Sequence, residues 1–525
     1  MICLISGSDK SRIIKNIFCI FALANNQNMN MNFDDDFDDD YPDDSFGEFE
    51  NLFELENKIK NYHYAMRRKD RDDYELPTAD VIENLVMYCM SNQRFDEALD
   101  FCNLWIEYYP ESLEAHNTLS YIFISLSRFR DAIVAADKVL EMSPDDTEGL
   151  MHKAMAFEGL GEPQTSLELL EKVMQIEPDN EVAKGLIALT HKSLENYEIA
   201  IEYFEQLINE FPDNAENYAH IASCYNDLRE FEKSVQYCKT AIDLSPYSED
   251  FWFNLGATYS NQKKYQDAID AFLMTLTIDE ESFSALTAIA KAYSESGDKM
   301  KAIEYFRQAL ILKPSDSDAL ADYASVLADS GDFIQAINHL QMAVRSSPMN
   351  YRAFFGLGVC YCAINNEKKA LEYFEKALNL KPSNKDILFI KGDILFSLER
   401  YSEAAKVFEF LYNMERGNIM YLFYLGRCSY FENYYERAAA YFGEMICWVN
   451  DETRDLLSQC FFWLAKTSVK QENFAMAITF LLHSFDLEEE RKLDYLLEFP
   501  ELLGKKYSKF NRDLKKAEKN HKRKG

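Results

Sequence analysis

The sequence predicts an all-α protein, an α-solenoid of helical hairpins, and three observations predict this class. First, prolines recur on one register of 34 residues, whose single vacant position in the regular part is filled by Glu280. A strict period of this length is typical of stacked repeats. Second, apolar residues recur at helical spacing inside each period. Third, only 17 glycines in 525 residues disfavour a turn-rich β fold. The prolines on this register are Pro110, Pro144, Pro178, Pro212, Pro246, Pro314, Pro348 and Pro382.

Residues 283–316 illustrate how one repeat is built. A first apolar stripe, Leu286, Ile289, Ala290 and Tyr293, predicts a helix that Gly297 ends, and Ala302, Phe306 and Ala309 predict a second helix. Pro314 has no N–H and disfavours the α conformation at Lys313, so the second helix must end there. Asp316 then offers a side-chain oxygen to cap the next helix. Each repeat is therefore a helical hairpin followed by a stop.

Two positions of the repeat are small along the whole chain. Repeats are counted from Ala79 in steps of 34 residues, except that the last one begins at Ser458. Position eight is Gly, Ala or Ser in every repeat but the first, which has Val86, and position twenty is Ala or Ser in all twelve. Small residues allow the two helices of a hairpin to approach closely.

These residues resemble the signature of the tetratricopeptide repeat (TPR) family. One repeat carries Trp252, Leu255, Gly256, Tyr259, Ala268 and Phe272 at the family's spacing, and a second carries Phe354, Leu357, Gly358, Tyr361, Ala370, Phe374, Ala377 and Pro382. The resemblance extends over residues 79–491. It implies a right-handed superhelix of about twelve hairpins, whose concave groove is lined by the first helix of each pair.

The pattern also predicts the domain organisation. We expect a disordered N-terminal segment at 1–50, a flanking helix at 51–78, the repeat array at 79–491, and a capping helix with a basic tail at 492–525. The register proline is absent after Pro382, and about five extra residues precede the last repeat. We therefore expect a lengthened helix or an altered bend near residues 453–457.

The N-terminus allows two interpretations. Residues 1–24 contain a basic stretch and a short apolar run, which could be a weak signal peptide, or translation could start at Met29 or Met31. Eleven scattered cysteines without a CxxC pair indicate buried, reduced thiols. We therefore expect a cytoplasmic protein, with export as the alternative if residues 1–24 are a signal. No stretch of 18 apolar residues predicts a membrane span.

Charge is distributed unevenly along the chain. The net charge of −34 disfavours nucleic-acid binding by the chain as a whole. Residues 34–44 hold eight aspartates, which predicts either a solubilising tail or an acidic–aromatic recognition motif that could also cover the groove. Residues 505–524 hold ten Lys or Arg, which predicts either a frayed terminal helix or a contact for RNA, anionic lipid or an acidic partner.

No motif predicts catalysis. The sequence has no HExxH, GxSxG or phosphate-binding loop, and His116, His152, His191 and His220 fall at packing positions. About 34 residues follow the last hairpin, too few for a further catalytic domain. We expect no enzyme activity, no cofactor and no metal.

The predicted groove changes character along the chain. Early repeats place mostly acidic residues there, Asp80, Glu83, Glu114, Asn117 and Glu148, and the cations occur singly in separate repeats. The Lys/Arg/Asn clamp with which some members of the family bind carboxylates is therefore missing. Late repeats instead predict an apolar channel for a protein or peptide partner, formed by Phe355, Phe389, Phe396, Phe423, Arg427, Tyr430 and Phe462. The expected function is a non-catalytic scaffold or adaptor. The alternatives are a regulatory subunit of an enzyme and an accessory factor of nucleic-acid machinery.

Overall fold

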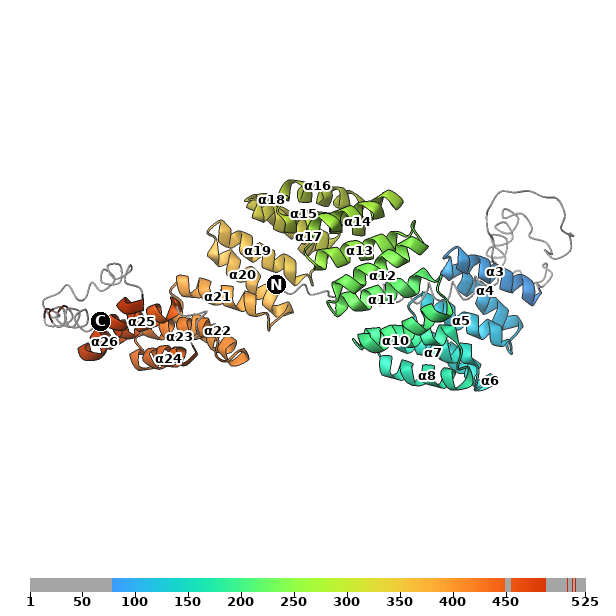
Figure 1. Ribbon diagram of the computed structural model, residues 1–525, viewed down its shortest axis with the longest axis horizontal. Coiled ribbons are helices and arrows are strands. Elements are labelled where there is room, and N and C mark those ends of the chain that lie inside the picture. The colour runs from blue at the N-terminus through green and yellow to red at the C-terminus, as the bar shows by residue number, and fades with distance from the viewer. Residues whose placement is uncertain (1–77, 449–454, 488–507, 509–511, 513–514, 516–525) are drawn as a thin grey trace. The chain divides into compact units, whose positions relative to one another are not determined.

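The computed structural model describes residues 78–448 and 455–487, together with residues 508, 512 and 515. In this part of the chain the regular structure is entirely helical, with 24 helices from α3 to α26 (Figure 1). The predicted all-α solenoid of helical hairpins is confirmed. The expectations for residues 1–50, 51–77 and the tail from 492 onward lie outside the described residues, apart from the three isolated positions.

The chain divides into two compact units, Met1–Ala285 and Leu286–Gly525, and the division falls inside α15 (Phe283–Ser296). Unit 1 contains α3 (Ala79–Ser91), α4 (Phe95–Tyr108), α5 (Leu113–Ser125), α6 (Phe129–Met142), α7 (Thr147–Leu160), α8 (Pro163–Ile176), α9 (Glu181–Ser193), α10 (Tyr197–Glu210), α11 (Ala215–Asp227), α12 (Phe231–Leu244), α13 (Glu249–Asn261) and α14 (Tyr265–Ile278). Unit 2 continues with α16 (Lys299–Leu312), α17 (Ser317–Asp329), α18 (Phe333–Ser346), α19 (Tyr351–Ala363), α20 (Glu367–Leu380), α21 (Lys385–Ser397), α22 (Tyr401–Met414), α23 (Ile419–Phe431), α24 (Tyr435–Trp448), α25 (Asp455–Lys470) and α26 (Phe474–Leu487).

Helices pack in the order in which they follow one another. In unit 1, α5 contacts α6, α6 contacts α7, and the first helices α5 and α7 also contact each other. In unit 2, α17, α18 and α19 repeat this arrangement. Successive first helices therefore line one face of each unit, as the repeat pattern predicts. The core between the helices is filled by fully buried rings from the second helices, Phe101, Phe204, Phe306, Phe374, Phe408 and Phe442.

The small positions have the packing role that the sequence predicts. Every residue at position twenty, from Ala98 to Ala477, is almost completely buried. A Cβ atom added to Gly358, at position eight, would lie 2.5 Å from the Phe374 ring of the same hairpin. Where serine replaces alanine, it bonds across the hairpin: Ser120 Oγ donates to the carbonyl of Ala132 at 2.9 Å.

The turn inside each hairpin has one conformation throughout the described repeats. Position fifteen has a positive φ in all twelve, although glycine is present there only at Gly161, Gly297 and Gly331. Two main-chain hydrogen bonds hold this left-handed turn; for example, the N–H groups of Asn365 and Asn366 donate to the carbonyls of Cys362 and Tyr361. Nine non-glycine residues adopt the same backbone, which glycine content alone does not reveal.

The turn between hairpins also follows the prediction. Helix α16 ends at Leu312, and Lys313 leaves the helical conformation with φ −130° and ψ 81°. Asp316 then accepts a hydrogen bond from the N–H of Ala319 at 2.8 Å. Helix α22 ends in the same way at Met414 although Arg416 replaces the register proline. Helix α25 has 16 residues where other first helices have 13 or 14, which confirms the expected lengthening.

Candidate partner-binding groove

Six of the seven residues predicted to line the late groove lie in one cluster on first helices of unit 2. Phe389 and Phe396, on α21, contact Tyr424 of α23 with ring-centre distances of 5.6 and 5.7 Å. Tyr430 of α23 lies 5.3 Å from Trp463 of α25. We use the name aromatic–arginine cluster for the following residues: Phe389, Phe396, Phe423, Tyr424, Arg427, Tyr430, Phe431, Phe462 and Trp463. It connects three successive repeats of unit 2.

The seventh residue, Phe355, lies apart from this cluster. Its ring packs 5.9 Å from Phe374 of its own hairpin. Phe355 occupies the same repeat position as Phe389, five residues into the first helix. Phe389 makes the same within-hairpin contact, 5.8 Å from Phe408, and in addition reaches Tyr424 of the next repeat.

Arg427 lies at the centre of the aromatic–arginine cluster. Its guanidinium carbon is 4.4 Å from the centre of the Phe396 ring, 5.4 Å from Phe423, 5.9 Å from Tyr424 and 5.3 Å from Trp463. Contacts of a guanidinium with several aromatic faces are favourable and orient its plane. Burial lowers the pKa of Arg427 from its usual range, and its Nε is buried with no hydrogen-bond partner.

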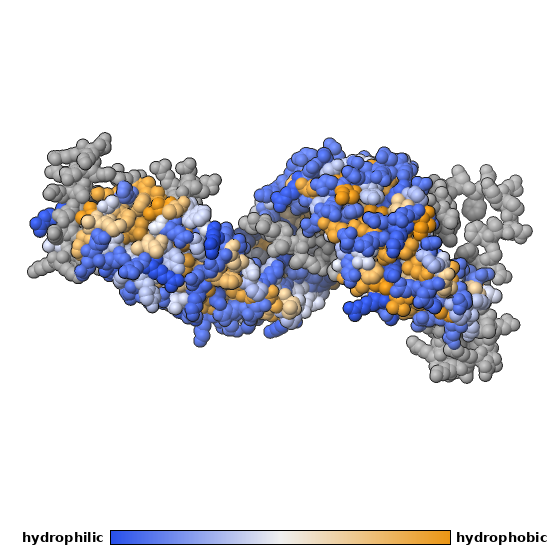
Figure 2. All heavy atoms as spheres, turned by 90° about the horizontal axis from the view of Figure 1, so that it is seen from below, coloured by the Kyte–Doolittle hydropathy of each residue, from blue (hydrophilic) through white to orange (hydrophobic). Residues whose placement is uncertain are grey.

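The rings of the cluster differ in exposure. Phe423, Tyr430 and Phe462 are buried, while Phe389, Phe396, Tyr424 and Arg427 each keep part of their surface exposed. Figure 2 shows hydrophobic residues gathered on the surface over the C-terminal helices, at the left of the view. A bound segment could touch these four residues directly, together with Phe431, which is exposed.

Tyr424, Phe431 and Trp463 are the members that the sequence analysis did not include. Tyr424 and Trp463 both stand at position six of their repeats, where earlier repeats have no Phe, Tyr or Trp, although His152 and His220 occupy this position. Tyr424 connects α21 to α23, and its hydroxyl donates to Asp393 Oδ1 at 2.7 Å. Burial raises the pKa of Tyr424 to about 12, so it remains protonated at neutral pH.

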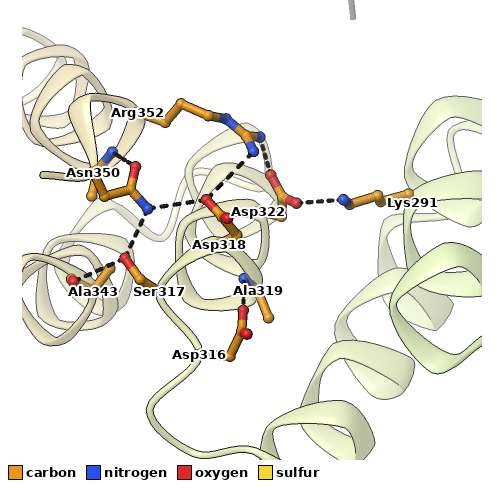
Figure 3. Close-up of polar contacts among 10 residues, drawn as sticks. Lys291, Asp316, Ser317, Asp318, Ala319, Asp322, Ala343, Asn350 and Arg352 are labelled. Carbon is orange, nitrogen blue, oxygen red and sulfur yellow. Dashed lines mark hydrogen bonds and ion pairs between the residues drawn. The ribbon is translucent and has the colours of Figure 1, made fainter. Parts of the chain in front are cut away.

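Nearer the start of unit 2, one aspartate pairs with two cations on the face formed by the first helices. Asp322 of α17 is largely buried and forms ion pairs with Lys291 of α15, at 2.8 Å, and with Arg352 of α19 (Figure 3). Asn350 at the start of α19 donates to Ser317 Oγ at 2.7 Å and to Asp318 at 3.1 Å. These contacts fasten three successive first helices and leave the two cations paired.

The corresponding face of unit 1 is acidic. Burial, followed by repulsion from Asp250, raises the pKa of Glu216 to about 7. Burial together with neighbouring carboxylates also raises the pKa of Glu83 and of Glu148, and Glu114 acts on both. The two units therefore present faces of different charge.

The histidines and thiols are mostly packed inside the hairpins. Burial lowers the pKa of His152 to about 4 and of His220 to about 3, so both are neutral at physiological pH. The described cysteines have free thiols and most are buried, although Cys447 on α24 is exposed, contrary to expectation. Within the described ranges, no three His, Cys, Asp or Glu side chains are placed to hold a metal ion. Nor does any helix described here have the length and apolar character needed to cross a bilayer.

Comparisons with known proteins agree with the repeat architecture. Residues 139–416 match the family model described as Tetratricopeptide repeat. A solved tetratricopeptide repeat protein from Parabacteroides merdae ATCC 43184 is 19% identical, with a TM-score of 0.40 over 47% of this chain and 98% of that one.

Two further solved structures resemble shorter portions of the chain. YrrB, described as a TPR protein with an unusual peptide-binding site, is 23% identical, with a TM-score of 0.30 over 36% of this chain and 97% of its own. MamA is 22% identical, with a TM-score of 0.29 over 32% of this chain and 97% of its own. No curated protein matches the chain. Since the family model spans more than half of the sequence, the chain belongs to the tetratricopeptide repeat family.

Proposed function

We propose that this protein is a non-catalytic scaffold that holds a segment of a partner protein on the aromatic–arginine cluster of unit 2. The observation that carries the proposal is the arrangement around Arg427, where partly exposed rings from α21 and α23 surround a cation on the face formed by first helices. Aromatic and arginine side chains supply most of the binding energy in many protein interfaces. The family supports this class of function, because its repeats generally serve as protein interaction modules.

The partner is best sought by co-purification with the full chain, followed by mass spectrometry. A stable enzyme in the eluate would identify the protein as a regulatory subunit, and a non-enzymatic partner would identify an adaptor. Binding is then measured with the purified partner and full-length variants.

The discriminating variant is Phe389→Ala, with Phe355→Ala as its matched control. Both rings stand at the same repeat position and both are partly exposed, but only Phe389 belongs to the cluster. Loss of a central aromatic contact costs about 2 kcal/mol, so Phe389→Ala should weaken binding roughly 30-fold. Phe355→Ala should change it less than about twofold. Equal binding by wild type and both folded variants would exclude the cluster as the binding site.

A further inference from the structure

Arg427 has no carboxylate partner within the described part of the chain, whereas four other cations on first helices of unit 2 are paired. Lys291 and Arg352 share Asp322, Lys385 pairs with Glu415 at 2.7 Å, and Lys391 pairs with Glu375 at 3.2 Å. The carboxylate of Asp393 lies close enough to influence Arg427, but it accepts the hydroxyl hydrogen bond of Tyr424.

The surroundings of Arg427 favour a charged hydrogen bond with an incoming group. Aromatic rings hold the guanidinium and exclude water from its Nε, which is buried without a partner. A cation in such surroundings interacts more strongly with an anion than a solvated cation does. The planar guanidinium also matches the two oxygens of a carboxylate.

We propose that Arg427 recognises a carboxylate side chain of the partner segment, an Asp or Glu that directly follows an aromatic residue. This inference rests on the proposed function, since it assigns the chemistry of the partner at the same site. The aromatic residue would pack against Phe389 and Phe396, whose rings keep part of their surface exposed.

Charge complementarity supports an acidic partner for this part of the groove. Lys466 of α25 lies 5.0 Å from the centre of the Trp463 ring, so a second cationic side chain contacts the rings of the cluster. The first helices of unit 1 instead present Glu83, Glu148 and Glu216, whose raised pKa values indicate an environment unfavourable to further negative charge. An acidic segment would therefore favour the cluster in unit 2.

This arrangement differs from a clamp made of several cations. One arginine supplies the charge, and its orientation comes from the rings of Phe396, Phe423, Tyr424 and Trp463. The tightest binding would thus require the acidic and the aromatic side chain together. Neither a polyacidic segment without rings nor an aromatic segment without a carboxylate would satisfy both parts of the site.

The test uses immobilised full-length protein and a pool of short synthetic peptides. Each peptide carries a central Phe followed by Asp, Glu, Asn, Gln, Ser or Lys, with flanks of Gly, Ser and Ala, and retained peptides are quantified by mass spectrometry. Wild type should retain the Asp and Glu peptides at least about tenfold better than the Asn and Gln peptides, because a charged hydrogen bond contributes more than a neutral one. Arg427→Met should reduce this ratio to within about twofold while Phe-containing peptides are still retained.

Arg352→Met is the matched control, because that cation is already paired with Asp322. It should leave the preference for Asp and Glu unchanged. If Arg427→Met loses its helical circular dichroism, Arg427→Lys decides: the lysine keeps the charge but loses the planar geometry, so the preference should fall at least about threefold. An unchanged preference in that variant overturns the inference.

The outcomes separate the two proposals. Retention of Phe peptides by wild type without any preference for Asp or Glu overturns the role of Arg427 and leaves the aromatic binding site standing. The same is true if Arg427→Met keeps the full preference. Failure of wild type to retain any Phe peptide overturns the proposed function together with this inference.

Discussion

Replacing Gly358 with alanine should reveal how tightly the hairpins are packed. Alanine favours a helix over glycine by about 1 kcal/mol. At Gly358 the added Cβ would lie 2.5 Å from the buried Phe374 ring, which must shift, and overpacking of this kind costs about 1–3 kcal/mol. We therefore expect Gly358→Ala to change the free energy of unfolding by between about zero and a loss of 2 kcal/mol.

Gly443 provides a control within the same unit. It lies inside α24, and a Cβ added there meets no atom within 4 Å. Gly443→Ala should therefore stabilise the protein by about 1 kcal/mol, which reflects helix propensity alone. The two variants should differ by about 1–3 kcal/mol in urea unfolding followed by circular dichroism.

Hydrogen exchange of α19 and α24 amides would assign each effect to its own repeat, because repeat arrays need not unfold in two states. In two other hairpins an alanine at position eight accompanies a buried phenylalanine, Ala188 with Phe204 and Ala290 with Phe306. A hairpin can thus adjust to the methyl group. Stabilisation by Gly358→Ala equal to that by Gly443→Ala would refute the packing argument.

Two further predictions concern charged groups. Asp322→Asn should lower the free energy of unfolding by about 1–2 kcal/mol, measured by urea denaturation. The variant loses a largely buried carboxylate, while its partners Lys291 and Arg352 remain half exposed to water. Equal stability would mean that solvent replaces both ion pairs. The pKa of Glu216 is raised in the folded state to about 7, so protonation stabilises the fold, and this stability is lost as pH rises from about 4.5 through 7. In urea titrations, Glu216→Gln should be more stable than wild type by about 1–3 kcal/mol at about pH 8 and similar to it near pH 4. The same difference in stability at both pH values would contradict the raised pKa of Glu216.

The sequence alone predicts the repeat fold in considerable detail. The prolines mark where second helices end, and the small residues at positions eight and twenty mark where two helices pack closely. The structure accordingly ends a helix before Lys313 and buries every residue at position twenty. The hairpin turn is less evident from local residues. Its left-handed residue is Glu195 in one repeat and Asn433 in another, and main-chain hydrogen bonds select the conformation.

The candidate site is only partly predictable. Aromatic residues at one repeat position identify Phe389 and Phe423, but the same rule includes Phe355. All three rings pack inside their own hairpins, and Phe389 also reaches Tyr424 of the next repeat. Tyr424 and Trp463 connect the cluster from the neighbouring position, where helix phase decides whether a ring points to the groove or to the core. Sequence spacing determines the phase of a helix only to within about one residue.

The left-handed hairpin turns bear on how the array moves. Nine non-glycine residues hold this backbone, and each incurs about 1 kcal/mol relative to an ordinary conformation. Repeats interact mainly with their neighbours, so these costs weaken individual hairpins more than the whole array. Glu399, in the turn between α21 and α22, is one such residue beside the aromatic–arginine cluster. Because each hairpin carries its own turn, a change at one turn acts mainly on the stability of that hairpin and of its two neighbours.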